Sequence, residues 1–109
     1  KESHGEKIIK NFLNDNNINY EIEKKFDDCK YNNILPFDFY LIDYNICIEF
    51  DGIQHFESVE FFGGDKSFII QQKRDKIKTE YCLKNNIQLL RIRYDENISD
   101  KLDFIFNIC

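Results

Sequence analysis

The sequence predicts an α/β fold in which a mixed central sheet is flanked by helices. Apolar residues recur at helical spacing in three segments, and four shorter segments rich in Ile, Phe and Tyr read as strands. These segments follow one another in the order α-β-β-β-α-β-α. A hairpin or meander followed by a helical crossover to a fourth strand gives a mixed sheet with helices on its faces.

The three predicted helices have recognisable ends. Ser3 and Glu6 form a capping-box pattern that begins the first helix, which ends at Asn16. Residues 67–85 give the longest and most regular helical pattern of the chain. Residues 98–108 form the last predicted helix, with a polar capping residue at its start.

The predicted strands are separated by polar connections. A short turn around Tyr44 and Asn45 joins the second strand to the third, and Gly52 allows the backbone to bend where the third strand ends. Residues 27–35 are expected to be a polar connection, and residues 57–66, with two adjacent glycines, a loop. The predicted strands cover residues 18–26, 36–42, 46–51 and 88–94.

Composition limits the classes of protein to which the chain can belong. Of its 109 residues, 42% are hydrophobic and 32% are charged, which is typical of one globular domain. No run of about 18 apolar residues could span a membrane, and no signal peptide is visible. We therefore expect an intracellular protein, from the cytoplasm, the nucleus or a virus- or phage-infected cell. Because the first residue is not Met, we expect residues 1–109 to be a single domain excised from a longer protein.

The cysteines do not predict a metal site. Cys29, Cys47, Cys82 and Cys109 form no C-x-x-C pair, so a zinc site is not expected. Cys47 and Cys82 lie within apolar patterns and are expected to be small core residues. Reduced thiols agree with an intracellular location.

The charge distribution is uneven. The net charge of −5 argues against a general DNA-binding surface, because phosphate contacts need Lys and Arg. Carboxylates that bind a metal would add to the acidic count, and the positive charge is clustered. Its clusters are Lys24 with Lys25, Lys73 and Arg74 with Lys76 and Lys78, and Arg91 with Arg93. The candidates for contacts with nucleic acid are Lys24, Lys25, Lys73, Arg74 and Lys76, and the alternative for those on the second helix is a solvated basic face.

Carboxylates in two apolar strands are the main chemical feature of the sequence. Side chains alternate along a strand, so Glu49 and Asp51 share one face, about 7 Å apart. Asp38 lies in the preceding strand, between Phe37 and Phe39. An acid within an apolar strand is costly unless it is paired or bound to a metal.

The length of the turn decides whether Asp38 joins the other two acids. A two-residue turn at Tyr44 and Asn45 would place Asp38 opposite Asp51, and a four-residue loop would place it opposite Glu49. A three-residue loop would place it opposite Phe50 and separate the acids. Converging carboxylates would suit Mg²⁺ or Mn²⁺, which can activate water for attack on a phosphodiester.

A structural role is the alternative for each of these residues. Asp38 or Asp51 could cap a turn, and Glu49 could pair with Arg91 or Arg93. Gln54 and His55 follow the bend directly, and a histidine there could act as a general acid or base, or hold the scissile phosphate. A packed or surface imidazole is the ordinary alternative.

The motifs together resemble a known superfamily. Pro36-Phe37-Asp38-Phe39, the run from Ile48 to Phe56, and Leu89-Leu90-Arg91-Ile92 resemble the restriction-endonuclease-like PD-(D/E)XK superfamily, and within it the Vsr-like and DUF559-type nucleases and related homing endonucleases. The resemblance covers most of the chain and implies an αβββαβ core with the metal where two central strands separate. It implies that Asp38 is the main metal ligand, that Glu49 or Asp51 completes the site, and that Glu6 lies near it.

The chain departs from the superfamily pattern at one position. The general motif has Lys two residues after the second acid, where this chain has Asp51. The Vsr-like branch also lacks this lysine and uses nearby histidines, of which this chain has His55. A lysine could instead come from the second helix, where Lys73 and Lys76 are candidates.

These observations predict a metal-dependent endonuclease domain that hydrolyses phosphodiester bonds in DNA. Asp38 with Glu49 or Asp51 would hold Mg²⁺ or Mn²⁺, and His55 would assist proton transfer. Glu6 and Gln54 would help to orient the metal, its water or the phosphate. The alternatives are a catalytically degenerate nucleic-acid-binding module of the same fold and a small-molecule hydrolase. The acidic net charge suggests that a homodimer or a further domain contributes to targeting.

Overall fold

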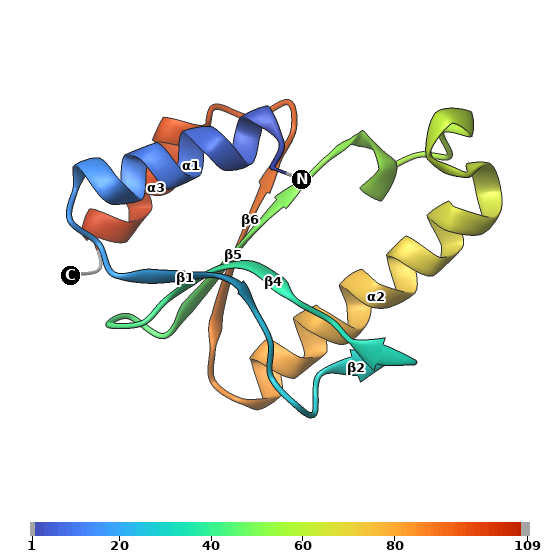
Figure 1. Ribbon diagram of the computed structural model, residues 1–109, viewed down its shortest axis with the longest axis horizontal. Coiled ribbons are helices and arrows are strands. Elements are labelled where there is room, and N and C mark those ends of the chain that lie inside the picture. Colours follow the sequence, from blue (N-terminus) through green and yellow to red (C-terminus); the bar gives the residue numbers. More distant parts are fainter. Residues whose placement is uncertain (1, 108–109) are drawn as a thin grey trace.

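A single four-stranded sheet organises the computed structural model, which describes residues 2–107 (Figure 1). The strand order is β1-β4-β5-β6. The antiparallel pairs are β1 with β4 and β4 with β5, whereas β5 and β6 are parallel. The strands are β1 (Tyr20–Lys24), β4 (Phe37–Leu41), β5 (Ile46–Asp51) and β6 (Gln88–Arg93).

Helices cover both faces of this sheet. Helices α1 (His4–Asp15) and α3 (Ile98–Asn107) lie together on one side, and the long helix α2 (Gly64–Lys84) lies on the other (Figure 1). Helix α2 connects β5 to β6, so it is the crossover that makes this pair parallel. The α/β class, the mixed sheet and the order of the main elements are as the sequence predicts.

Two hydrophobic cores follow from the alternation of the central strands. Even-numbered residues of β5, such as Ile46 and Ile48, are buried against the side that carries α1 and α3. Odd-numbered residues face α2, where Cys47 packs with Cys82 and Ile87. The carboxylates of β5 are therefore on the α2 face, at the end of an apolar core.

The first helix begins as the sequence predicts. Ser3 Oγ accepts the Glu6 N–H at 3.2 Å, and Glu6 Oε1 accepts the Ser3 N–H at 2.9 Å, so the capping box is formed. Ile9 and Leu13 on the inner face are fully buried. The cap places Glu6 in the first turn of α1, close to the sheet.

Two connections are more ordered than the sequence suggests. Residues 27–35, expected to be a polar connection, contain the two-stranded sheet of β2 (Lys30–Tyr31) and β3 (Asn33–Ile34), with Asn32 at φ +67° between them. Burial of Cys29 and Leu35 at the two ends anchors this hairpin. After β5, the chain forms two short 3₁₀ helices, η1 (Ile53–His55) and η2 (Glu60–Phe62), and α2 begins at Gly64 rather than at residue 67.

The described thiols are all in the interior of the protein. Cys29, Cys47 and Cys82 are buried and free; Cys109 and Ile108, the expected end of the last helix, lie outside the described residues. Along residues 2–107, none of the helices combines the length and the apolar character needed to cross a membrane.

Gly5→Val should destabilise the protein through the contact between α1 and β5. A Cβ atom on Gly5 would overlap Cζ of Phe50, so the ring would have to move. We expect the free energy of unfolding to fall by about 1–3 kcal/mol, the usual effect of overpacking, measured by chemical denaturation. Phe50→Leu should make room, so the double variant should lose less stability than the sum of the two single variants; additive losses would contradict the proposed contact.

Candidate active site

The loop between β4 and β5 has four residues, which settles the register left open by the sequence. Leu41 pairs with Ile46 and Phe39 with Ile48, so Asp38 lies opposite Glu49. The loop closes through the N–H of Asn45, which donates to Leu41 O at 2.9 Å. Asn45 has a φ of +56°, a conformation that asparagine tolerates better than most residues.

The two strands separate just where the acids face each other. The described pairing of β4 with β5 ends at Phe39 and Ile48. Beyond it, the Asp38 N–H donates to Glu49 Oε2 at 2.6 Å, and the Phe50 N–H donates to Asp38 Oδ2 at 2.8 Å. Each carboxylate thus binds a backbone N–H of the opposite strand, in place of the regular ladder. These crossed hydrogen bonds hold Asp38 and Glu49 side by side at the separation.

A lysine from α2 completes this arrangement. Lys78 Nζ lies 2.6 Å from Glu49 Oε1, and the two side chains are only 11% and 3% exposed. The same ammonium group lies 5.3 Å from the centre of the Phe37 ring. Lysine is rarely buried without a partner, so the ion pair fixes Lys78 at the acids.

Lys78 belongs to one of the predicted basic clusters, but the candidate lysines for the site were Lys73 and Lys76, both of which are exposed on α2. A signal for Lys78 was available in the helical spacing, because it follows Arg74 by one turn. Four polar residues at intervals of three and four positions share this face of α2: Ser67, Gln71, Arg74 and Lys78.

The environment raises the pKa of Asp38 from 3.8 to about 8. Burial is the largest cause, and the negative charges of Glu49 and then Glu6 act in the same direction. The hydrogen bond from the Phe50 N–H and the positive charge of Lys78 oppose the rise. The site therefore has a shortage of positive charge, which a cation could supply.

An open cleft of about 510 Å³ gives access to these groups. Ser3 and Phe50 are part of its wall. Seven residues of chemical interest line the cleft: Glu6, Asp38, Glu49, Gln54, His55, Arg74 and Lys78. Asp51, the third predicted metal ligand, is not among the lining residues.

Asp51 instead joins a second group of titratable residues. His55 Nδ1 lies 2.9 Å from Asp75 Oδ2 and 3.5 Å from Asp51 Oδ1. One ligand atom from each of these three residues lies within 4.8 Å of the others, a spacing that could hold a metal ion. Burial raises the pKa of Asp51. Burial is also the largest single influence on Asp75 and would raise its pKa, but the hydrogen bond from His55, the positive charges of His55 and Arg91 and the hydrogen bond from Gln71 together hold its pKa below the usual value.

Arg91 already supplies positive charge to this second group. Its Nη1 lies 3.1 and 3.2 Å from the two oxygens of Asp51. Its Nη2 donates to Asp75 O at 3.0 Å and to Thr79 Oγ1 at 3.1 Å. The sequence alternative that paired Glu49 with Arg91 or Arg93 is not what the structure shows, because Glu49 pairs with Lys78 and Arg93 with Asp95.

The residues of the predicted basic clusters differ in whether they line the cleft. Arg74 lines it, whereas Lys73 and Lys76 are exposed on other parts of the α2 surface. Lys24 lies over the rings of Phe26 and Tyr40, at 5.4 and 5.3 Å from their centres. Lys25 is exposed next to it.

Comparison with known proteins finds a distant viral relative. The chain is 30% identical over 74 residues to the Uncharacterized protein 307L of Invertebrate iridescent virus 6, a match that covers 67% of this chain and 36% of the viral protein. No protein-family model and no solved structure matches the chain. The resemblance to the PD-(D/E)XK superfamily therefore rests on the motif residues.

Asp38→Asn should stabilise the protein at pH 8 in the absence of divalent metal ions. With a pKa raised from 3.8 to about 8, Asp38 favours the folded state fully below pH 3.8, and this contribution is lost as the pH rises toward about 8. The amide keeps an acceptor for the Phe50 N–H and removes the charge. We expect a gain of about 2–5 kcal/mol at pH 8, of which the upper value is the full linkage effect of the raised pKa, and this gain should disappear near pH 4, measured by denaturation in EDTA.

The matched control is Asp103→Asn, which changes an exposed acid of α3. It should show no comparable gain between these pH values. A stability difference for Asp38→Asn that is independent of pH would contradict the raised pKa.

Proposed function

We propose that this chain is a metal-dependent endonuclease domain that hydrolyses phosphodiester bonds in DNA. The observation that carries the proposal is the convergence of Asp38, Glu49 and Lys78 where β4 and β5 separate, on an open cleft. Two acids and a lysine at such a point match the residue types of the PD-(D/E)XK pattern, with the lysine supplied by α2. This supports the family resemblance at a position where the sequence alone departs from it.

The oxygen donors suit a hard divalent cation. Asp38 and Glu49 would hold Mg²⁺ or Mn²⁺, and Glu6 lines the same cleft. Their hydrogen bonds leave lone pairs for a metal, because a carboxylate offers about four acceptor positions. The raised pKa of Asp38 agrees with a site that gains from an added cation. When bound, such an ion polarises the phosphodiester and lowers the pKa of a coordinated water.

Lys78 would act on the attacking water and on developing negative charge. Its ammonium group is fixed beside Glu49, so the pair can orient one water molecule at the edge of the cleft. The positive charge also stabilises the extra negative charge of the transition state at phosphorus. Lys78 thus replaces His55 as our candidate for the residue that handles the nucleophile.

Gln54 and His55 would then act on the substrate and on the shape of the cleft. Gln54 lines the cleft and can donate to a phosphate oxygen through its amide. His55 is held by Asp75, so it ties η1 to α2 and positions Gln54. Arg74 can contact the phosphate from the α2 side.

DNA is the partner that this cleft suits best. Lys73 and Lys76 flank Arg74 on α2 and could extend phosphate contacts along the backbone, and Lys24 and Lys25 could add contacts from β1. The net charge of −5 limits non-specific binding, so a homodimer or a further targeting domain would increase affinity.

Lys78→Met should reduce Mg²⁺-dependent nicking of supercoiled DNA by about 10²- to 10⁴-fold, and Asp38→Asn and Glu49→Gln should do so at least as strongly. The rate of conversion of supercoiled to open-circular plasmid measures this. Lys84→Met, on an exposed lysine at the end of the same helix, is the matched control and should keep the wild-type rate.

The same assay can reject the proposal. If the wild type and Asp38→Asn are equally inert with Mg²⁺ and Mn²⁺, the chain is not a nuclease, and the alternative of a non-cleaving nucleic-acid-binding module replaces it.

Metal titration distinguishes the two acidic groups. Asp38→Asn should weaken Mn²⁺ binding in calorimetry by at least about tenfold, since it removes a primary ligand charge. Asp75→Asn should leave this binding within about threefold, because Asp75 already has partners in His55 and Arg91. The opposite pattern would assign the ion to Asp51, His55 and Asp75.

A further inference from the structure

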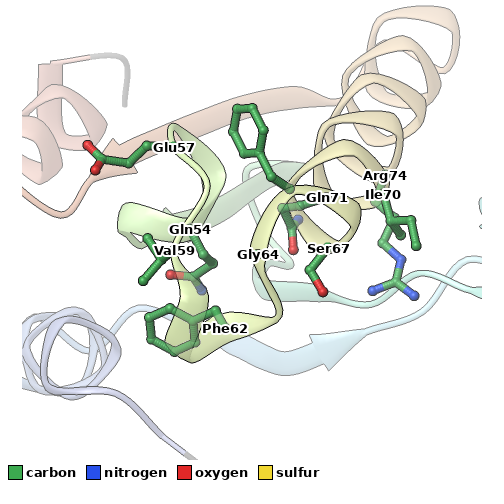
Figure 2. Close-up of a pocket in the computed structure, with 10 residues that line it drawn as sticks. Gln54, Glu57, Val59, Phe62, Gly64, Ser67, Ile70, Gln71 and Arg74 are labelled. Carbon is green, nitrogen blue, oxygen red and sulfur yellow. The ribbon is translucent and has the colours of Figure 1, made fainter.

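A second cavity of about 310 Å³ lies beside the candidate active site, between the segment that follows β5 and the first turns of α2 (Figure 2). We call it the side pocket. Gln54, Val59 and Phe62 lie on one side of it, and Ser67 and Gln71 of α2 lie on the other (Figure 2). Its volume is at the small end of the range of about 300–1,000 Å³ that is typical of small-molecule sites.

The side pocket and the active-site cleft share part of their walls. Gln54, Phe62, Gln71 and Arg74 line both cavities. A molecule in the side pocket would therefore lie next to whatever occupies the cleft. Arg74, at this boundary, brings a guanidinium group that suits a phosphate oxygen.

The lining combines aromatic surface with neutral hydrogen-bonding groups. Phe62 is 46% exposed, so one side of its ring is open to a ligand. The Gln54 amide and the Ser67 hydroxyl make no side-chain hydrogen bond within residues 2–107, and both remain available to a ligand. The Gln71 amide donates to Asp75 Oδ1 at 3.1 Å, which leaves its oxygen as an acceptor.

A flat, polar-edged ring is the ligand that these groups fit. Aromatic side chains stack on the face of a nucleobase, and amides and hydroxyls form hydrogen bonds with its edge. The pocket has room for a single ring system. An arginine at the boundary with the cleft suits the phosphate that such a base would bring with it.

We propose that the side pocket binds an unpaired nucleobase adjacent to the scissile phosphate. This inference rests on the proposed function and narrows its substrate class to DNA with an unpaired nucleotide, such as a bulge or a single-stranded junction. A base in an intact duplex is stacked and paired, so it would first have to leave the helix to reach Phe62. The site thus discriminates against perfectly paired DNA by the free energy of extruding a base.

Binding rather than cleavage tests the inference. Fluorescence anisotropy in Ca²⁺ would compare a labelled duplex that contains one unpaired nucleotide with its fully paired counterpart. We expect the wild type to prefer the first by about 5- to 100-fold, the range that stacking of one base provides. Phe62→Ala should remove most of this preference by removing the stacking surface.

A second variant and a neighbouring control guard against indirect effects. Ser67→Trp places a large side chain at an exposed position that lines the side pocket but not the cleft, so it should block the pocket and also remove the preference. Ile69→Ala is the matched control, because Ile69 lies nearby on α2, is 53% exposed and lies outside the lining of both cavities. Thermal unfolding would verify that all three variants are folded.

The outcomes separate this inference from the proposed function. Equal affinity of the wild type for the two duplexes, or equal loss of preference in Ile69→Ala and Phe62→Ala, would overturn the side-pocket assignment even if DNA is cleaved. A retained preference in Asp38→Asn, which should not cleave, would support a base-binding role independent of catalysis. A preference without cleavage by the wild type with any metal would leave the pocket in place and reject the nuclease.

Discussion

The site depends on the crossed hydrogen bonds between Asp38 and Glu49 where β4 and β5 separate. Strands that part inside a core expose backbone N–H groups, which must find acceptors. Here the carboxylates are those acceptors, so the acids stabilise the separation that in turn aligns them. Burial of charge so close to the core remains tolerable because Lys78 neutralises Glu49 and because Asp38 favours the protonated form.

Helix α2 links this separation to the rest of the molecule. Near its middle, Asp75 contacts His55, and the backbone oxygen of Asp75 accepts a hydrogen bond from Arg91 of β6. One turn later, Lys78 reaches Glu49 of β5. The buried and half-buried ion pairs thus fix the position of the helix relative to two parallel strands, and the hydrophobic contacts of Cys82 continue this packing beyond them.

The sequence predicted the fold more completely than it predicted the arrangement of the candidate site. The spacing of apolar residues was sufficient to predict the helices and strands, because an element that buries one or two of its faces must place apolar side chains at the period of that element. Alternation also placed Glu49 and Asp51 on one face, but it could not reveal that Asp51 turns to Arg91, which depends on the parallel neighbour β6. The residue opposite Asp38 depended on the length of the loop, which the sequence left open. The role of Lys78 was not recognised from the sequence, because a lysine on a helix is ordinarily a solvated side chain.

If the two cavities act as proposed, the four residues that line both of them link recognition of the base to the reaction in the cleft. Gln54, Phe62, Gln71 and Arg74 cannot adapt to a ligand on one side without altering the wall on the other. Ligands in the two cavities would therefore influence each other's affinity, and this dependence would be reciprocal. An evolutionary change in these side chains would shift specificity and turnover together, so divergence of substrate choice is easier through Val59 or Ser67, which line the side pocket alone.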